Sequence, residues 1–209
     1  MLTKTGNTSA YVNGVGVFSD DGSTWTNYTA SNGITQSEYG INAIAVSGSS
    51  LYAAGGDSIS ISTNGGLSWS SSVINALGQN GFILSIAVSG RANFAGTTDR
   101  LFISTDGGNT WTTYQAPENG YDYVRSLLVV GSTVYAAVGG GLSISQDGGT
   151  TWVNHPYGNG LGFVDSVAAS GSTIYAAGAG LSISSDGGAT WRNITGTPPP
   201  VQDANARNL

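Results

Sequence analysis

Short apolar segments alternate with polar, glycine-rich segments along the whole chain, and none shows the 3.6-residue period of a helix. The clearest stretch lies between Val164 and Thr195. Runs rich in Val, Ile, Tyr and Thr are separated there by Gly, Ser and Asp, which predicts short antiparallel strands joined by tight turns. The strands are expected at 164–170, 173–177, 181–184 and 190–195.

The same order recurs in three earlier stretches, each with an aromatic residue four positions after a turn glycine. Both faces of these strands carry apolar residues, as in Ile83–Val88, so each sheet has to be sandwiched between two neighbours. Radial stacking of four-stranded antiparallel blades meets this requirement and predicts an all-β chain folded as a β-propeller. The aromatic residues are Tyr52, Phe94 and Tyr135, and they follow Gly48, Gly90 and Gly131.

A short motif that ends in tryptophan marks each unit. Its five copies contain all five Trp residues of the protein, and successive Trp residues are 44, 42, 41 and 39 positions apart. A period in this range indicates a repeat architecture, so five blades are expected. The copies are FSDDGSTW (18–25), STNGGLSW (62–69), STDGGNTW (104–111), SQDGGTTW (145–152) and SSDGGATW (184–191).

The motif residues have a structural interpretation. The aspartate follows a strand end, where its carboxylate can accept hydrogen bonds from turn amides, and the glycines allow positive φ. The second copy has Asn64 in this place, and an amide oxygen can still accept these bonds. This substitution counts against catalysis or metal binding by the position. The expected structural residues are Asp21, Asn64, Asp106, Asp147 and Asp186, with Trp25, Trp69, Trp111, Trp152 and Trp191.

The pattern Ser-x-Asp-x-Gly-x-Thr-Trp resembles the Asp-box, also called the BNR repeat. Three copies match it in full, the second has Asn64 and Ser68 as replacements, and the first lacks one residue. The resemblance covers residues from about 8 to 195 and implies a β-propeller with one box per blade. In that family the box lies away from the ligand site, and it occurs in sialidases as well as in receptors and surface proteins. The resemblance therefore implies a fold and no particular activity.

The five blades are expected at about 1–30, 40–73, 82–115, 123–155 and 163–196, with a C-terminal tail at 197–209. The first blade shows its second to fourth strands but lacks a clear innermost strand. Either Leu2–Thr5 or the tail can fill this place. The spacing from box to inner strand puts Val201–Ala206 where a further inner strand would begin, which favours the tail. A disordered tail, or an unfilled edge that pairs with another chain, is the alternative.

The composition excludes several classes of function. The formal net charge is -6, and the single lysine and five arginines form no basic run, so nucleic-acid binding is not expected. The chain has no cysteine, no apolar stretch long enough for a bilayer and no signal-peptide core at its start. Scarce charge and abundant Ser, Thr, Asn and Gly favour an exported or surface protein. No cofactor and no metal are expected.

Candidate ligand residues gather on one face of the predicted propeller. In a four-stranded blade, the blade-to-blade loops and the turns between the second and third strands share one side, called here the loop face. Six of the seven acidic residues outside the boxes map there. The second inner-strand residue also changes from blade to blade, which fits a polar site near the axis as well as it fits neutral drift. The candidates are Asn42, Arg100, Tyr121, Asp122, Arg125, Tyr157 and Asp165.

These observations favour a non-enzymatic binding module that recognises carbohydrate or protein through the loop face. The alternative is a structural or assembly protein, in which the blades form part of a fibre, a coat or a larger complex, and self-assembly fits this alternative. A sialidase-like glycoside hydrolase fits less well. Only Arg100 and Arg125 map to the loop face, whereas a sialidase needs three arginines for a carboxylate.

Overall fold

The structure is a computed structural model that describes residues 2–5, 14–18, 25–35, 40–74, 81–114 and 123–194. Its described part is all-β apart from one 3-10 turn, Ala30–Asn32. The strands are β1 (Leu2–Thr5), β2 (Gly14–Phe18), β3 (Trp25–Tyr28), β4 (Ala43–Ser47), β5 (Ser50–Gly55), β6 (Ser58–Ser62), β7 (Ser70–Val73), β8 (Ile83–Ser89), β9 (Ala92–Thr97), β10 (Leu101–Ser104), β11 (Thr112–Tyr114), β12 (Val124–Val130), β13 (Thr133–Val138), β14 (Gly141–Ser145), β15 (Val153–Pro156), β16 (Val164–Ser170), β17 (Thr173–Gly178), β18 (Leu181–Ser184) and β19 (Arg192–Asn193).

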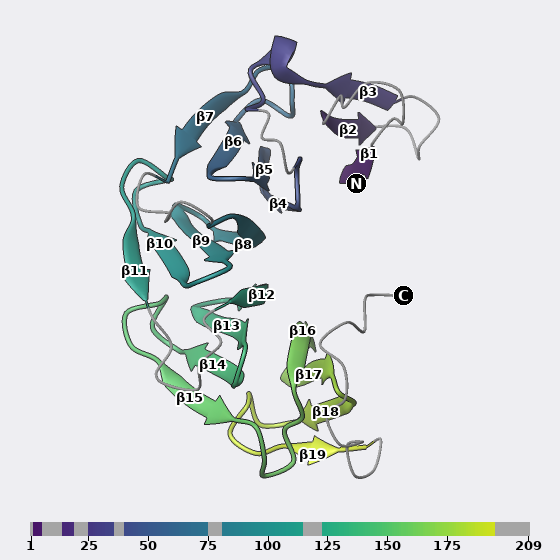
Figure 1. The fold of residues 1–209 in the computed structure, drawn as a ribbon, viewed down its shortest axis with the longest axis vertical. Helices are drawn as coiled ribbons and strands as arrows, with labels where there is room; N and C mark the ends of the chain where they lie inside the picture. Colours follow the sequence, from purple (N-terminus) through teal and green to yellow (C-terminus); the bar gives the residue numbers. More distant parts are fainter. Residues whose placement is uncertain are drawn as a thin grey trace.

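The strands form five antiparallel sheets, each a meander of consecutive strands, and confirm the predicted propeller architecture. The first sheet is β1–β3, and the second to fifth sheets are β4–β7, β8–β11, β12–β15 and β16–β19. The sheets follow one another along an open arc, with the first and fifth sheets at its two ends (Figure 1). The inner strands β4, β8, β12 and β16 line the concave side, and β7, β11, β15 and β19 lie on the convex side.

The core lies between successive sheets. The face of each sheet that points toward the next sheet along the chain is called here its forward face. On the forward face of the second sheet, Tyr52 and Ile59 pack against Ile83, Ala95 and Phe102 of the third sheet. Burying one such large side chain stabilises a fold by about 1.5–3 kcal/mol, so these interfaces hold the arc together.

The same packing is repeated at the next two interfaces. Phe94 of the third sheet packs against Val124 and Val134 of the fourth, and Tyr135 of the fourth packs against Val164 of the fifth. The recurring aromatic residues are 6%, 1% and 4% exposed in the second, third and fourth sheets. The apolar character of both strand faces in the sequence therefore reflects a sheet that is covered on both sides.

Polar contacts near the axis also join the inner strands. The Asn42 side-chain amide donates a hydrogen bond to the Ile83 carbonyl at 3.0 Å, linking the second and third sheets. The Ser85 hydroxyl donates to the Val124 carbonyl at 3.0 Å, linking the third and fourth sheets. At the fourth interface the Ser126 hydroxyl oxygen accepts from the backbone amide of Val167 at 3.2 Å. Each contact satisfies a backbone group at an inner strand, so the sheets are held by hydrogen bonds as well as by apolar packing.

The first sheet differs from the sequence-based expectation. Leu2–Thr5 was expected as a possible innermost strand, but as β1 it pairs with β2, the strand that precedes the first box. In the other sheets this place belongs to the second strand. An unpaired strand edge requires a partner, and β1 supplies it for β2. The tail 197–209 lies outside the described residues, so its role in ring closure stays a prediction.

One buried polar side chain interrupts the apolar packing. Asn93 of β9 is 1% exposed, and neither its amide nitrogen nor its amide oxygen has a hydrogen-bond partner in the described part of the chain. The corresponding residues of the other four-stranded sheets are Leu51, Val134 and Ile174, all buried and aliphatic. A buried polar group without a partner lowers the free energy of unfolding, so Asn93 is a local weakness between the second and third sheets.

We predict that Asn93→Val stabilises the protein by about 1–3 kcal/mol, because it removes the desolvation cost of an unpaired amide. Urea unfolding of the wild type and the variant measures the difference. Asn154→Val is the matched control, since the Ser143 hydroxyl donates a hydrogen bond to the Asn154 side chain and the loss of this bond should destabilise the protein. A destabilised Asn93→Val variant contradicts the prediction.

Candidate functional site

The candidate site begins with a local irregularity of the inner strands. In the third, fourth and fifth sheets the register between the inner and second strands shifts once, which leaves one inner-strand residue without a partner in the ladder. These bulge residues are Leu84, Arg125 and Asp165. A β-bulge redirects a side chain away from the regular faces of its sheet. The positions that vary between repeats are therefore the ones that the core does not constrain.

Two of the candidate residues meet at neighbouring bulges. Arg125 Nε lies 3.5 Å from Asp165 Oδ1, and the guanidinium carbon lies 4.3 Å from the centroid of the Tyr123 ring. The side chains of Arg125 and Asp165 are 46% and 44% exposed. An ion pair and a cation–π contact at this exposure are each worth about 1 kcal/mol or less. The structure thus presents a cation and an anion side by side to solvent.

Tyr123 was not among the sequence-based ligand candidates. It belongs to the aromatic residues that recur just before each inner strand, which favoured a packing role. Its place two residues before the variable position Arg125 in the sequence was the signal that could have identified it.

Asn42 has a different place from Arg125 and Asp165. It precedes β4, its backbone amide donates to the Ala54 carbonyl at 2.8 Å, and it is exposed. Its side-chain amide is engaged with Ile83 of the third sheet, as described above. The structure therefore gives Asn42 a contact between sheets rather than a contact with Arg125.

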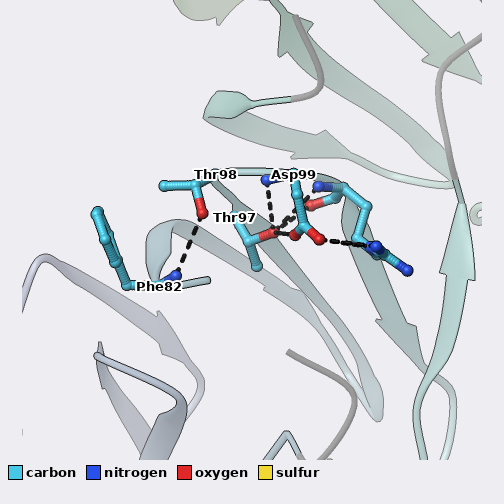
Figure 2. Close-up of polar contacts among 5 residues, drawn as sticks. Phe82, Thr97, Thr98 and Asp99 are labelled. Atoms are coloured by element: carbon cyan, nitrogen blue, oxygen red, sulfur yellow. Dashed lines mark hydrogen bonds and ion pairs between the residues drawn. The ribbon is translucent and has the colours of Figure 1, made fainter. Parts of the chain in front are cut away.

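Arg100 lies in the turn between β9 and β10. Its Nε donates to Asp99 Oδ2 at 2.9 Å, and its terminal nitrogen lies 2.8 Å from the same oxygen. Figure 2 shows how Thr97 organises this turn: its hydroxyl oxygen accepts hydrogen bonds from the backbone amides of Asp99 and Arg100. Thr98 Oγ1 in turn accepts from the backbone amide of Phe82 at 3.4 Å. The charge of Arg100 is thus paired within its own turn.

Tyr157 follows β15 and is 51% exposed. Its backbone amide donates to the Gly140 carbonyl at 2.9 Å, which ties it to the turn between β13 and β14. The next residues form a tight turn with Asn159 at a φ of 51°. Tyr157 is therefore an exposed aromatic ring on an ordered backbone. The other two candidates, Tyr121 and Asp122, lie outside the described residues.

The box segments, residues 62–69, 104–111, 145–152 and 184–191, form closed hydrogen-bonded turns. In the third copy, Asp106 Oδ1 accepts from the backbone amides of Asn109 and Thr110, and Oδ2 accepts from the Thr110 hydroxyl at 2.6 Å. The Ser104 hydroxyl donates to Oδ1 at 2.8 Å. The Trp111 indole donates to the Gly108 carbonyl at 3.1 Å. Trp69, Trp152 and Trp191 make the same contact in their own copies.

Asn64 makes the same turn with an amide. Its Oδ1 accepts from the Ser68 backbone amide at 3.0 Å, and its Nδ2 donates to the Ser68 hydroxyl at 2.9 Å. In the first copy, Asp21 lies outside the described residues, and Trp25 begins β3. In all four described copies, the carboxylate or amide forms its hydrogen bonds with residues of its own turn.

These hydrogen bonds shift the ionisation of the box aspartates. The Thr151 hydroxyl and backbone amide lower the pKa of Asp147 to about 2. Bonds from Thr110 and Thr190 hold the pKa of Asp106 and of Asp186 well below the ordinary value of 3.8. His155 of β15 has a pKa lowered by burial. Within the described ranges, His, Asp and Glu side chains form no group of three or more that would hold a metal ion.

Comparison with known proteins gives the fold. No family model and no curated protein matches this chain. Solved β-propeller structures are similar, among them a GH74 enzyme of Niastella koreensis (24% identity, 88% of this chain, 28% of that chain, TM-score 0.61). YCF48 bound to D1 peptide (22% identity, 88% and 75%, TM-score 0.52) and the extracellular domain of BT4673 from B. thetaiotaomicron (16% identity, 87% and 26%, TM-score 0.61) are two others.

The coverage of these structures is uneven. This chain spans 28% of the length of the GH74 enzyme, 26% of the BT4673 extracellular domain and 75% of the YCF48 chain. At these identities the likeness establishes a propeller fold, and the site has to be argued from the residues of this chain.

We predict that the three box aspartates make the protein sensitive to acid. A folded-state pKa below 3.8 stabilises the fold fully above about pH 4, and this contribution is lost as the pH falls toward 2 and lower. Urea unfolding at a series of pH values compares the wild type with the variant D106N/D147N/D186N. The difference in the free energy of unfolding is expected to be constant above about pH 4 and to shrink below it.

The reverse substitution is the control for this prediction. Asn64→Asp adds a carboxylate at the equivalent position of the second copy, so the loss of stability in acid should become steeper. A difference between wild type and triple Asn variant that stays constant down to pH 2 contradicts the assignment.

We predict a weak coupling between Arg125 and Asp165. Both side chains are nearly half exposed, so a double-mutant cycle with Arg125→Met and Asp165→Asn should give less than about 1 kcal/mol, decreasing with added salt. Urea unfolding of the four proteins measures it. A coupling above about 2 kcal/mol that resists salt means that the pair is a structural element rather than an exposed one.

Proposed function

We propose that this chain is a non-catalytic binding module that recognises a segment of another protein through the loop face. The observation that carries the proposal is the Arg125–Asp165 pair, which is half exposed, lies at two neighbouring bulges and rests against Tyr123. The core does not require these residues, because the corresponding bulge residue of the third sheet is Leu84.

The chemistry of the pair favours a peptide ligand. A guanidinium group donates several hydrogen bonds and a carboxylate accepts them, so together they match a backbone or side chain that offers both acceptors and donors. An adjacent tyrosine ring adds apolar contact. The YCF48 structure supports the proposal to a limited degree, since it is a propeller of comparable size that was solved with a bound peptide.

We also propose that the repeats belong to the Asp-box family. Four described segments share the Ser, Asp or Asn, Gly and Trp contacts, and each is closed within eight residues. In such a propeller the boxes lie on the opposite side from the loop face. The engaged carboxylates of Asp106, Asp147 and Asp186 support a structural role and leave recognition to the loop face.

Carbohydrate is the second candidate ligand, and Tyr157 is the observation that favours it. A tyrosine ring that is 51% exposed on an ordered turn offers a flat surface for a sugar ring. The proposal includes a location outside the cell or on its surface, because charged residues are scarce and Ser, Thr, Asn and Gly are abundant. No helix in the described part of the chain is long and apolar enough to cross a membrane.

The pairing of the loop-face arginines supports a protein without enzymatic activity. Arg100 contacts Asp99 and Arg125 contacts Asp165, so each arginine of the loop face in the described residues already has an acidic neighbour. A sialidase-like site would instead turn several arginines toward a substrate carboxylate.

The test is binding of the fluorescent protein to a peptide array and to a glycan array. We expect peptide signals that fall about tenfold or more in Arg125→Ala and in Asp165→Ala, because each variant removes the hydrogen-bonding group that the proposal assigns to the ligand. Arg192→Ala is the matched control, since Arg192 is exposed on the outer strand β19. Glycan signals that depend on Tyr157 but not on Arg125 favour the second candidate. Silence on both arrays contradicts a binding module of either kind.

A further inference from the structure

The forward face of the fifth sheet is uncovered, although it carries the residues that are buried on the other sheets. Tyr175 is 36% exposed, whereas the equivalent Tyr52, Phe94 and Tyr135 are at most 6% exposed. Ala177 and Gly178 of β17 are exposed too, whereas the last residues of β5, β9 and β13 are buried. The fifth sheet thus has an apolar forward face with no neighbour in the described residues.

The inner end of this face repeats the hydrogen-bonding position of the earlier sheets. Ser85 and Ser126 each join their inner strand to the next sheet. Ser166 occupies the same place in β16, one residue after the bulge, and is exposed. The fifth sheet therefore carries the polar as well as the apolar part of the contact between sheets.

The outer end of the forward face carries a position that, on the earlier sheets, contacts the box of the next sheet. At the first interface the ring of Trp69 lies 6.2 Å from the ring of Tyr28, and at the third the ring of Trp152 stacks on Tyr114 at 4.7 Å. At the second interface Ser72 Oγ donates to the carbonyl of Gly108 in the next box. At these three interfaces the outer strand of one sheet thus contacts the box of the following sheet, and this contact position is called here a seat.

Ile194 has the equivalent position next to β19 and is 44% exposed. In the described residues it seats no box, because no sheet follows the fifth. Conversely, no described strand precedes β1, so within the described residues the first sheet has no sheet before it. In the described part of the chain, the forward face of the fifth sheet and the opposite face of the first sheet are therefore unmatched, and they lie at the two ends of the arc (Figure 1).

We propose that the forward face of the fifth sheet docks the first sheet of a second copy of this chain. The argument is the continuity of an interface that the chain already forms between each pair of successive sheets. The first and fifth sheets of one copy stand apart along the arc, so the match is made between copies. Such a head-to-tail contact is heterologous, and it leaves a free face at each end of the pair.

The first experiment measures the mass of the wild-type chain by light scattering after size exclusion, over a wide range of concentrations. We expect a mass that rises with concentration above the 21.1 kDa of one chain. Tyr175→Asp and Ala177→Asp each put a charge into the docking face and should restore the single-chain mass. Val153→Asp is the matched control, because Val153 is 63% exposed on the outer strand of the fourth sheet.

The second experiment tests the head-to-tail arrangement by complementation. Gly16→Asp puts a charge on the face of β2 opposite Val15, which packs toward the second sheet, and Tyr175→Asp puts a charge on the fifth sheet, so each variant alone should fail to assemble. Their mixture retains one intact pair of surfaces and should form a species of two chains and no larger one. A symmetric contact between two fifth sheets, or closure of the ring within one chain, gives no complementation.

Three results would overturn the proposal. They are a wild-type chain that has the mass of one chain at every concentration, an assembly that Val153→Asp weakens as much as Tyr175→Asp does, and a mixture that does not pair. Array binding of the single-chain Tyr175→Asp variant separates this proposal from the proposed function, because the loop-face residues are unchanged in it.

Discussion

The structure depends on one constraint: each four-stranded sheet is apolar on both faces and has to be covered on both. Tyr52, Phe94 and Tyr135 meet this constraint by reaching from one sheet into the next. Because the sheets stack in sequence order, the inner strands come to lie together on the concave side of the arc. The loop face and the open fifth sheet are both consequences of this stacking.

The same constraint explains where variable residues are tolerated. A residue that packs between two sheets has to be apolar or small, whereas a bulge residue is turned away from the interface. Leu84, Arg125 and Asp165 occupy that position in successive sheets, and their chemistry differs accordingly. Asn93 shows the opposite case, since it places an amide inside an interface that is aliphatic in the other sheets.

The boxes are local devices that need little from the rest of the fold. The carboxylate of Asp106 bonds to groups no more than four residues away, and Asn64 makes an equivalent set of contacts. A turn of this kind can be recognised from the sequence, because all its donors and acceptors are close along the chain. The strands were predictable for the same reason, since alternation and turn residues are local signals.

The sequence by itself therefore determined the repeat, the strands of the four complete sheets, the box turns and the residues free to vary at the start of each inner strand. Only the tertiary structure decided that β1 pairs with β2, that Arg125 meets Asp165, that Asn42 holds the third sheet and that Tyr175 is left uncovered. These outcomes join residues about 10 to 40 positions apart, or depend on which sheet has a neighbour. No local pattern encodes such a relation, because it arises from how whole sheets stack.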